Sequence, residues 1–343
     1  MEQKKEIEIS SGIVFHTILI LLALWFLYAI LDIIALVFIS VIIVAAMDPL
    51  VDFLQRKKVP RTASVLGVYL ALVLLIALAL SVLLPILSNQ FDDFSQNLPD
   101  YFQSAESNIE KIKDFFQAQH IAIDGDQLGT DLGETIFALP RNIFSKTIGV
   151  FSTFISVIVV FSLAFYMTIE KDGIKKFISS ISPDKYKDYA VDLTLRIKEK
   201  IGKWMLGQLF LMFVVFVLVS LGMFLVGMPY ALILGIFAGV MEIIPYVGPI
   251  ISAVPGIVLG FLISPTLGFL ALLVYLVSQQ LENHVIVPQV MKKAVGLNPI
   301  SVILALLIGA RLGGAIGAIL AIPVATGISL FINDLLEKRK FGA

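Results

Sequence analysis

Long apolar stretches alternate with polar ones along the whole chain. Seven of them are candidate membrane segments: residues 13–47, 62–87, 147–169, 204–227, 229–263, 266–287 and 300–332. A membrane-crossing helix needs about 20 apolar residues, because the hydrocarbon core is roughly 30 Å thick. Segments 13–47, 229–263 and 300–332 are too long for one ordinary span and short for two. The pattern predicts an all-α polytopic membrane protein with about eight membrane helices, some of them in short or re-entrant hairpins.

Lysine and arginine between these segments predict their orientation, because basic loops stay in the cytoplasm. Basic residues lie at both ends of 13–47, so this segment is expected to turn back on itself near Asp32. Residues 88–146 carry few basic and many acidic side chains, which places them outside as an extracytoplasmic helical insertion. Residues 170–203 are rich in lysine and are expected to form a cytoplasmic amphipathic segment. One membrane domain, 1–343, then contains both stretches, with both termini in the cytoplasm.

The same rule makes two segments enter the membrane from opposite faces. Segment 229–263 should begin and end outside, and segment 300–332 should begin and end inside. Each is interrupted near its middle, at Glu242–Pro249 and at Arg311–Gly314. We expect two opposed hairpins whose tips place Glu242 and Arg311 at comparable depth. The alternative is that one of the two segments is a single tilted span.

Both polar stretches have helical periodicity. In 186–204, apolar residues recur every three or four positions. This indicates either a helix on the cytoplasmic membrane surface that runs into the next span, or a helix packed on another segment of the protein. A similar stripe runs from Phe91 to Phe116, and Pro99 should break any continuous helix near its start. That stripe would pack against the membrane or a neighbouring helix, or contact another subunit, so a homo-oligomer stays open.

Composition agrees with the membrane class. Of the 343 residues, 58% are hydrophobic and 15% are charged, and the mean hydropathy is +0.96. Soluble domains contain less apolar and more charged sequence. The net charge of −1 offers no basic excess for nucleic acid. The absence of cysteine excludes disulfides and thiolate chemistry.

Motifs of common enzymes are missing. The chain has no GxxxxGK[ST] phosphate loop, no HExxH and no GxGxxG motif, and its three histidines are far apart. We therefore expect no enzyme activity, no metal site and no cofactor. The expected partners are the lipid bilayer and a small-molecule or ion substrate.

Polar residues inside apolar segments are the best candidates for a functional site, because a charge in a membrane is costly to keep. Glu242 precedes a proline-broken backbone, which persists in a membrane only where protein or a water-filled cavity surrounds it. Glu242 and Arg311 could instead be an ion pair that fixes packing. A polar cluster near the inner end of 266–287 could line an aqueous path or be a solvated helix end. The transport or ion-binding candidates are Glu242, Arg311, Glu282, Asn283, Gln279 and Gln280.

Glycine and proline mark the expected breaks and close contacts. Small residues four positions apart let helix backbones approach closely in lipid. Besides this structural role, the small residues would let the helices move between different packing arrangements. The predicted break and hinge positions are Pro245, Gly248, Pro249, Pro288, Asn298, Pro299, Gly309, Gly313, Gly314 and Gly317.

Four motifs together resemble the autoinducer-2 exporter family, a group of permease-like membrane proteins. They are Met47-Asp-Pro-Leu-Val-Asp52 with Arg56 to Pro60, Glu242-Ile-Ile-Pro-Tyr-Val-Gly-Pro249, Gln280-Leu-Glu-Asn-His-Val-Ile-Val-Pro288 with Gly296-Leu-Asn-Pro299, and Gly309 to Pro323. The resemblance covers nearly the whole chain. It implies a transporter of the bacterial inner membrane. Members are linked to export of autoinducer-2, and others are described as sodium- or lithium-for-proton antiporters.

The leading hypothesis is a secondary transporter that exports a small polar solute such as autoinducer-2. The first alternative is a cation/proton antiporter that uses Glu242 or Glu282 as its ion-binding carboxylate. The second is a membrane scaffold that transports nothing and binds a partner with its outer helices. Charges inside apolar segments favour transport over the scaffold.

Overall fold

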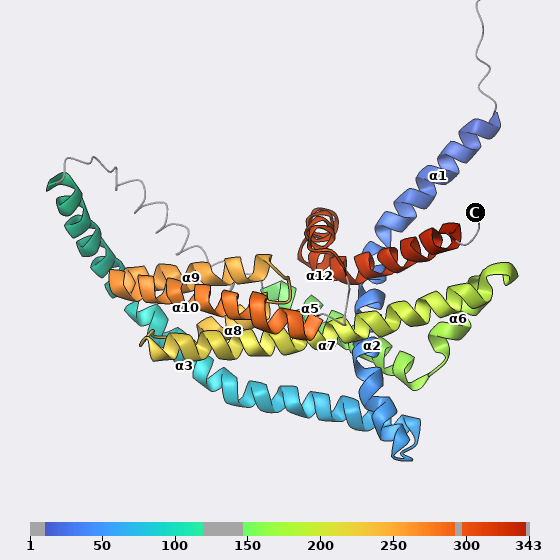
Figure 1. Cartoon of the computed structure of the whole chain (residues 1–343), viewed down its shortest axis with the longest axis horizontal. Helices are drawn as coiled ribbons and strands as arrows, with labels where there is room; N and C mark the ends of the chain where they lie inside the picture. The colour runs from blue at the N-terminus through green and yellow to red at the C-terminus, as the bar shows by residue number, and fades with distance from the viewer. Residues whose placement is uncertain (1–10, 119–146, 292–296, 341–343) are drawn as a thin grey trace, which may run out of the picture.

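The computed structural model describes residues 11–118, 147–291 and 297–340, and every regular element within these ranges is helical (Figure 1). Five helices in this part of the chain are long and apolar enough to cross a membrane: Leu31–Arg56, Arg61–Tyr101, Asp184–Leu225, Pro265–Met291 and Pro299–Glu337. Shorter apolar helices accompany them. The prediction of an all-α polytopic membrane protein is confirmed.

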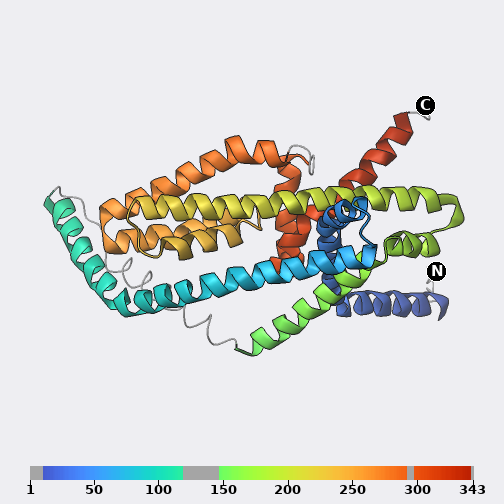
Figure 2. The same cartoon turned by 90° about the horizontal axis from the view of Figure 1, so that it is seen from below.

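The first apolar segment forms α1 (Ser11–Ala29) and α2 (Leu31–Arg56). The break at Ile30 lies close to the predicted position. The two helices diverge, however, and do not fold side by side as a hairpin (Figures 1 and 2). The backbone hydrogen bonds from Ile30 N to Phe26 O and from Ile34 N to Ile30 O persist at 3.1 and 2.9 Å. The chain therefore bends here with little loss of helical bonding.

Helix α3 (Arg61–Ala118) joins the second apolar segment to the start of the predicted outer insertion. Pro85 and Pro99 both lie inside this helix, so the expectation that Pro99 ends it is wrong; the helix bends instead (Figure 2). Tertiary contacts hold the helix on both sides of Pro99. The Tyr101 and Tyr230 hydroxyls lie 3.2 Å apart, and the Phe94 ring packs edge-on against Tyr230. This part of the aromatic stripe thus packs against the turn that follows α7.

Helices α5 (Thr147–Ile169) and α6 (Gly173–Ile181) lead through a short 3-10 turn (Asp184–Tyr186) to α7 (Lys187–Leu225). As predicted, α7 joins the amphipathic stretch to the next apolar segment without a break. Its buried residues Ile201 and Trp204 pack with Ile42 of α2 and with Ile322 from the C-terminal helix. The C-terminal end of this apolar face is therefore covered by protein, as one of the two interpretations expected, whereas Tyr186 at its start is exposed.

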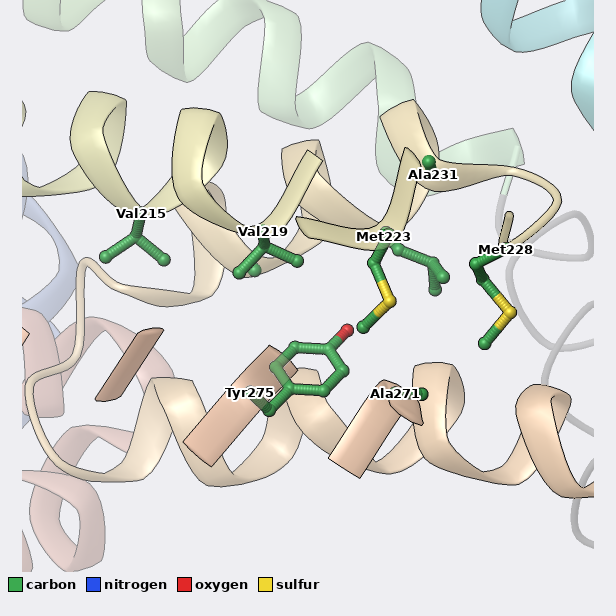
Figure 3. Close-up of a cluster of buried hydrophobic side chains, with 9 residues drawn as sticks. Val215, Val219, Met223, Met228, Ala231, Ala271 and Tyr275 are labelled. Carbon is green, nitrogen blue, oxygen red and sulfur yellow. The ribbon is translucent and has the colours of Figure 1, made fainter. Parts of the chain in front are cut away.

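Segment 229–263 forms two short helices, α8 (Ala231–Met241) and α9 (Val247–Ile263), which are followed by α10 (Pro265–Leu281). At 1.5 Å per residue, α8 and α9 are about 16 and 25 Å long. A π-helical turn (Glu282–Ile286) and α11 (Val287–Met291) complete this part. Figure 3 shows the core between α7, α8 and α10, where Val219, Met223, Ala271 and Tyr275 are buried. This bundle frames the candidate site.

The last helix, α12 (Pro299–Lys340), is a hairpin of two arms. Gly313 and Gly314 interrupt it, and Gly314 adopts φ 58° and ψ −140°, a conformation that favours glycine. The arms then come into backbone contact, since a Cβ on Gly309 would overlap the Gly317 carbonyl oxygen. Both predicted hairpins are thus interrupted where the sequence indicated.

Candidate functional site

The turn between α8 and α9 exposes helix ends inside the bundle, and its sequence explains why. Pro245 has no N–H to continue α8, and Tyr246 takes a positive φ of 65°. Gly248 permits the tight reversal, because a Cβ there would overlap the Met241 carbonyl oxygen. Glu242 is the C-cap residue of α8. The broken backbone therefore sets a carboxylate at the tip of the hairpin.

This carboxylate meets a second one, at the end of α10. Glu242 is 1% exposed and Glu282 is 5% exposed, and their carboxyl groups lie within hydrogen-bonding reach of each other. Glu282 is the first residue of the π-helical turn, and Pro288, which has no N–H to donate, follows that turn. Such turns widen a helix and are frequent at functional sites. The two helix irregularities thus bring two buried acids together.

Gln208 of α7 fastens the turn from the other side. Its side chain is fully buried, and its Nε2 donates to the Glu242 backbone carbonyl at 2.5 Å. This satisfies one of the carbonyls that the end of α8 leaves free. Gln208 Oε1 and Glu242 Oε2 are buried and have no hydrogen-bond partner within the described ranges. Gln208 therefore positions Glu242, and one side-chain oxygen of each residue remains without a donor in the described part of the chain.

The pair of acids lacks a compensating base in the described part of the chain, where no ion pair involves Glu242 or Glu282. Two carboxylates this close repel each other unless a proton or a cation lies between them. Burial raises the free-energy cost of keeping both carboxylates ionised, because an unpaired charge away from water is strongly disfavoured. The arrangement is thus suited to binding and releasing a positive charge.

A cavity of about 360 Å³ extends from Glu282 between α7, α8, α9 and α10. Most of its wall is aliphatic, and Ile250, Val254 and Leu276 form an exposed rim. Its polar side chains are Ser252 of α9, Tyr275, Ser278 and Gln279 of α10, and Glu282 of the π-helical turn that continues α10. Tyr275, Ser278, Gln279 and Glu282 follow the i, i+3, i+4, i+7 spacing of one helix face. The buried Tyr275 hydroxyl, seen between α7 and α10 in Figure 3, finds no hydrogen-bond partner among the described residues.

Some predicted site residues do not join this cavity. Gln279 lines it, whereas Gln280 and Asn283 are exposed on another side of the helix. Arg311 is exposed near the turn of the α12 hairpin and forms no ion pair with Glu242. The reason is that α12 packs against α2 and α7, whereas the α8–α9 tip meets α10 and Gln208. The alternative that Glu242 and Arg311 form an ion pair is therefore wrong.

Most of the predicted break positions fall at turns or helix ends, and Gly309 and Gly317 lie where the two arms of α12 touch. Asn298 caps α12, its Oδ1 accepting a hydrogen bond from the Ile300 N–H at 3.0 Å. Pro299 then begins the helix, a position where a missing N–H costs little. Pro245 lies in the α8–α9 turn, Gly248 and Pro249 in the first turn of α9, and Pro288 beside the π-helical turn. Gly313 and Gly314 form the turn of α12, and Gly309 and Gly317 lie in its two arms.

Four residues at the site were not predicted: Gln208, Ser252, Tyr275 and Ser278. A signal existed for three of them. Gln208 is a polar residue within an otherwise apolar segment, and Tyr275 and Ser278 share a helix face with Gln279 and Glu282. Ser252 offered no comparable pattern, because its role depends on where α9 packs.

Fold and site together define a polytopic helical membrane protein with a buried polar site between broken helices. A sequence model described as AI-2E family transporter matches residues 14–337. The chain belongs to the AI-2E transporter family, and its class is that of membrane transport proteins. This confirms the resemblance seen in the sequence.

Curated relatives support the assignment. "Putative transport protein YueF" of Bacillus subtilis is 30% identical over 305 residues, covering 85% of this chain and 81% of the relative. "Putative transport protein YrrI" of the same organism is 27% identical, with 88% and 86% covered. A "Putative transport protein" of Thermotoga maritima is 23% identical, with 98% of both chains covered. The similarity thus extends over nearly the full length of each protein.

Proposed function

We propose that this protein is a secondary transporter of the bacterial inner membrane that exports a small polar solute, such as autoinducer-2, through the α7–α10 cavity. The observation that carries the proposal is the cavity itself, which is bounded by a broken helical hairpin and lined by the buried Glu282, whose carboxyl group interacts with that of Glu242. Discontinuous membrane helices of this kind mark the binding sites of many secondary transporters.

The cavity has the size and chemistry for a small ligand. Its volume of about 360 Å³ lies at the lower end of the range for small-molecule sites. The hydroxyls of Ser252, Tyr275 and Ser278 and the amide of Gln279 can donate and accept hydrogen bonds. A small hydroxylated molecule would satisfy groups such as the Tyr275 hydroxyl that otherwise stay unpaired. A scaffold that transports nothing would have no use for these buried polar groups.

The contact between Glu242 and Glu282 favours a second candidate, a cation/proton antiporter. A buried acid pair without a basic partner can hold either a proton or a monovalent cation between its oxygens, but not both. Such competition is the basis of exchange. In a solute exporter, the same pair would instead couple proton movement to solute movement.

Purified protein reconstituted in sealed vesicles separates these candidates. Uptake of labelled autoinducer-2 driven by a pH gradient supports the solute exporter. A change of internal pH on addition of Na⁺ or Li⁺, without any solute, supports the antiporter. If neither flux exceeds that of empty vesicles under any gradient, both proposals are wrong and the scaffold is favoured.

Neighbouring residues of α10 provide a matched control for the site. Gln279→Ala should reduce the flux severalfold, because Gln279 lines the cavity. Gln280→Ala should leave it unchanged, because Gln280 is exposed elsewhere. Equal effects of the two substitutions would place the transport pathway away from this cavity.

A further inference from the structure

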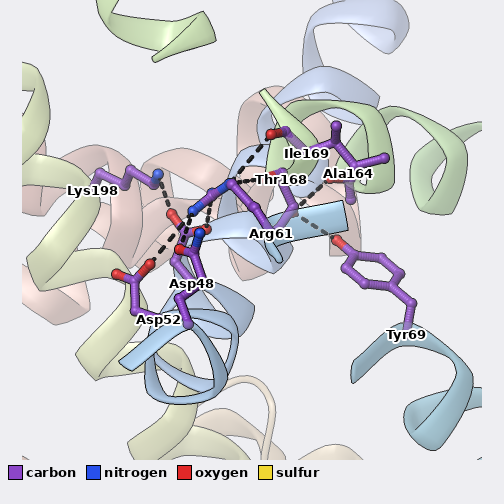
Figure 4. Close-up of polar contacts among 9 residues, drawn as sticks. Asp48, Asp52, Arg61, Tyr69, Ala164, Thr168, Ile169 and Lys198 are labelled. Atoms are coloured by element: carbon purple, nitrogen blue, oxygen red, sulfur yellow. Dashed lines mark hydrogen bonds and ion pairs between the residues drawn. The ribbon is translucent and has the colours of Figure 1, made fainter. Parts of the chain in front are cut away.

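Charged residues around the turn between α2 and α3 lie on two sides. The inner side faces the rest of the protein, and the outer side faces away from it. On the inner side, Arg61 forms ion pairs with Asp48 and Asp52, each at 3.4 Å, and Lys198 of α7 pairs with Asp48 (Figure 4). Arg61 Nε also donates to the Thr168 carbonyl at the end of α5, at 2.9 Å. The acidic side chains of this turn are therefore engaged by inward-facing bases.

The outer side carries three consecutive bases: Arg56, Lys57 and Lys58 are all exposed. None of them forms an ion pair with an acidic residue in the part of the chain that the structure describes. Because Arg61 and Lys198 already hold the nearby aspartates, this side has a local excess of positive charge. Such an excess attracts anions over a distance set by the ionic strength.

Exposed apolar residues adjoin these bases. Leu50 and Phe53 precede them on α2 and are 49% and 55% exposed. The Lys57 ammonium lies 4.7 Å from the centre of the Phe53 ring. An apolar stretch, then an aromatic ring, then basic side chains is the order in which a membrane helix passes from the hydrocarbon core to the headgroups. The turn is therefore suited to an amphiphile and not merely to a free anion.

Lys58 occupies a backbone position that usually belongs to glycine. Its φ is 68°, and the bonds from Lys58 N to Gln55 O (2.9 Å) and from Val59 N to Leu54 O (3.4 Å) close the end of α2 as a Schellman motif. Glycine would adopt this conformation without strain. Replacing Lys58 with glycine thus removes a charge without opposing the fold, which makes a clean test possible.

We propose that Arg56, Lys57 and Lys58, together with Phe53, bind the headgroups of anionic phospholipids in the leaflet that this turn faces. The three bases neutralise the headgroup charge, while Phe53 and Leu50 contact the upper acyl chains. Each basic residue near a membrane surface raises the affinity for anionic lipid roughly fivefold. This interaction does not depend on which solute or ion the protein transports.

A local probe tests the proposal in the full-length protein. The chain has no native cysteine, so Pro60→Cys, at an exposed position of the turn, accepts a single fluorophore. The labelled protein is reconstituted in nanodiscs that contain brominated phosphatidylglycerol or brominated phosphatidylcholine as the quencher. We expect stronger quenching by the anionic lipid, and a decline of this preference as salt is raised.

The variant Arg56→Gln/Lys57→Gln/Lys58→Gly should lose most of the preference, and Lys58→Gly alone should reduce it severalfold. The matched control Lys171→Gln/Lys175→Gln/Lys176→Gln removes three exposed lysines near α6 and should retain it. Equal quenching by the two lipids in the unaltered protein overturns the proposal. A preference that persists in the triple variant at the turn also overturns the proposal. So does a preference that inorganic phosphate abolishes at a concentration too low to screen charges by ionic strength alone.

Discussion

At the scale of single residues, the candidate site depends on buried polar atoms without partners. Glu242 Oε2, Gln208 Oε1 and the Tyr275 hydroxyl are all in this state within the described ranges. Leaving such groups unpaired costs roughly 1–3 kcal/mol each. A fold that keeps several of them around one cavity and one carboxyl pair has room for a ligand that pairs them.

Replacing Glu242 with glutamine should reduce transport at least tenfold while the protein still inserts and purifies. Glutamine keeps the shape of the side chain but cannot release a proton and carries no negative charge to balance a cation. Initial rates in vesicles, together with the gel-filtration profile, measure both properties. Full activity in Glu242→Gln would remove this residue from the mechanism, and failure to purify would assign it to packing.

Tyr275→Phe offers a milder test of the cavity. It removes only the hydroxyl, which has no partner to lose in the described part of the chain. Stability should therefore be unchanged or slightly increased, while the half-saturating solute concentration should rise a few-fold. Thermal unfolding in detergent and concentration-dependent uptake report the two effects separately. Lower stability with normal uptake would show that the hydroxyl serves the fold.

At the scale of elements, the hairpins owe their shape to a few backbone positions. In α12, Gly314 has a positive φ and Gly313 does not, although a Cβ on either residue would meet no neighbouring atom within 4 Å. Glycine is therefore favoured at Gly314 by its backbone conformation and not by lack of space for a side chain. At Gly248, beside the α8–α9 turn, glycine is favoured by lack of space, because its φ is not positive and it touches the end of α8.

We expect Gly314→Ala to destabilise the protein by about 1–3 kcal/mol, the usual cost of such a conformation for a residue with a Cβ. Gly313→Ala is the matched control and should have a smaller effect. Thermal unfolding of both variants in the same detergent measures the difference. If the two variants unfold together, the turn of α12 tolerates rearrangement and is not a rigid tip.

At the scale of the whole molecule, α7 connects the region around α2 and α12 with the bundle of α8, α9 and α10. Its N-terminal half is joined to α2 by Lys198–Asp48 and to α12 by Arg196–Asp334, which pairs through two hydrogen bonds of 3.0 and 2.5 Å. Its C-terminal half packs in the bundle with α8 and α10 (Figures 1 and 3). One continuous helix thus links the polar clusters at one end to the candidate site at the other.

Orientation in the membrane is the prediction that belongs to this scale. Single cysteines at Gln96 and Lys185, both exposed, can be tested with a membrane-impermeant thiol reagent on intact cells. Because the lysine-rich stretch should remain in the cytoplasm, only the cysteine at Gln96 should react. Labelling of Lys185→Cys alone would invert the proposed topology.

The sequence by itself determined the membrane class, the apolar segments and the positions at which helices break. These features depend on local chemistry: apolar length sets a span, proline removes a donor, and glycine permits a positive φ. Glu242 and Glu282 could likewise be selected as costly charges in apolar segments.

Only the tertiary structure decided which of these residues meet. Glu242 and Glu282 lie on different helices, and their contact follows from the packing of α8 and α9 against α7 and α10. The same packing left Arg311 outside the site and brought in Gln208, Ser252 and Tyr275. Local patterns carry no information about such pairings, because close packing between helices is satisfied by side chains that are distant in sequence.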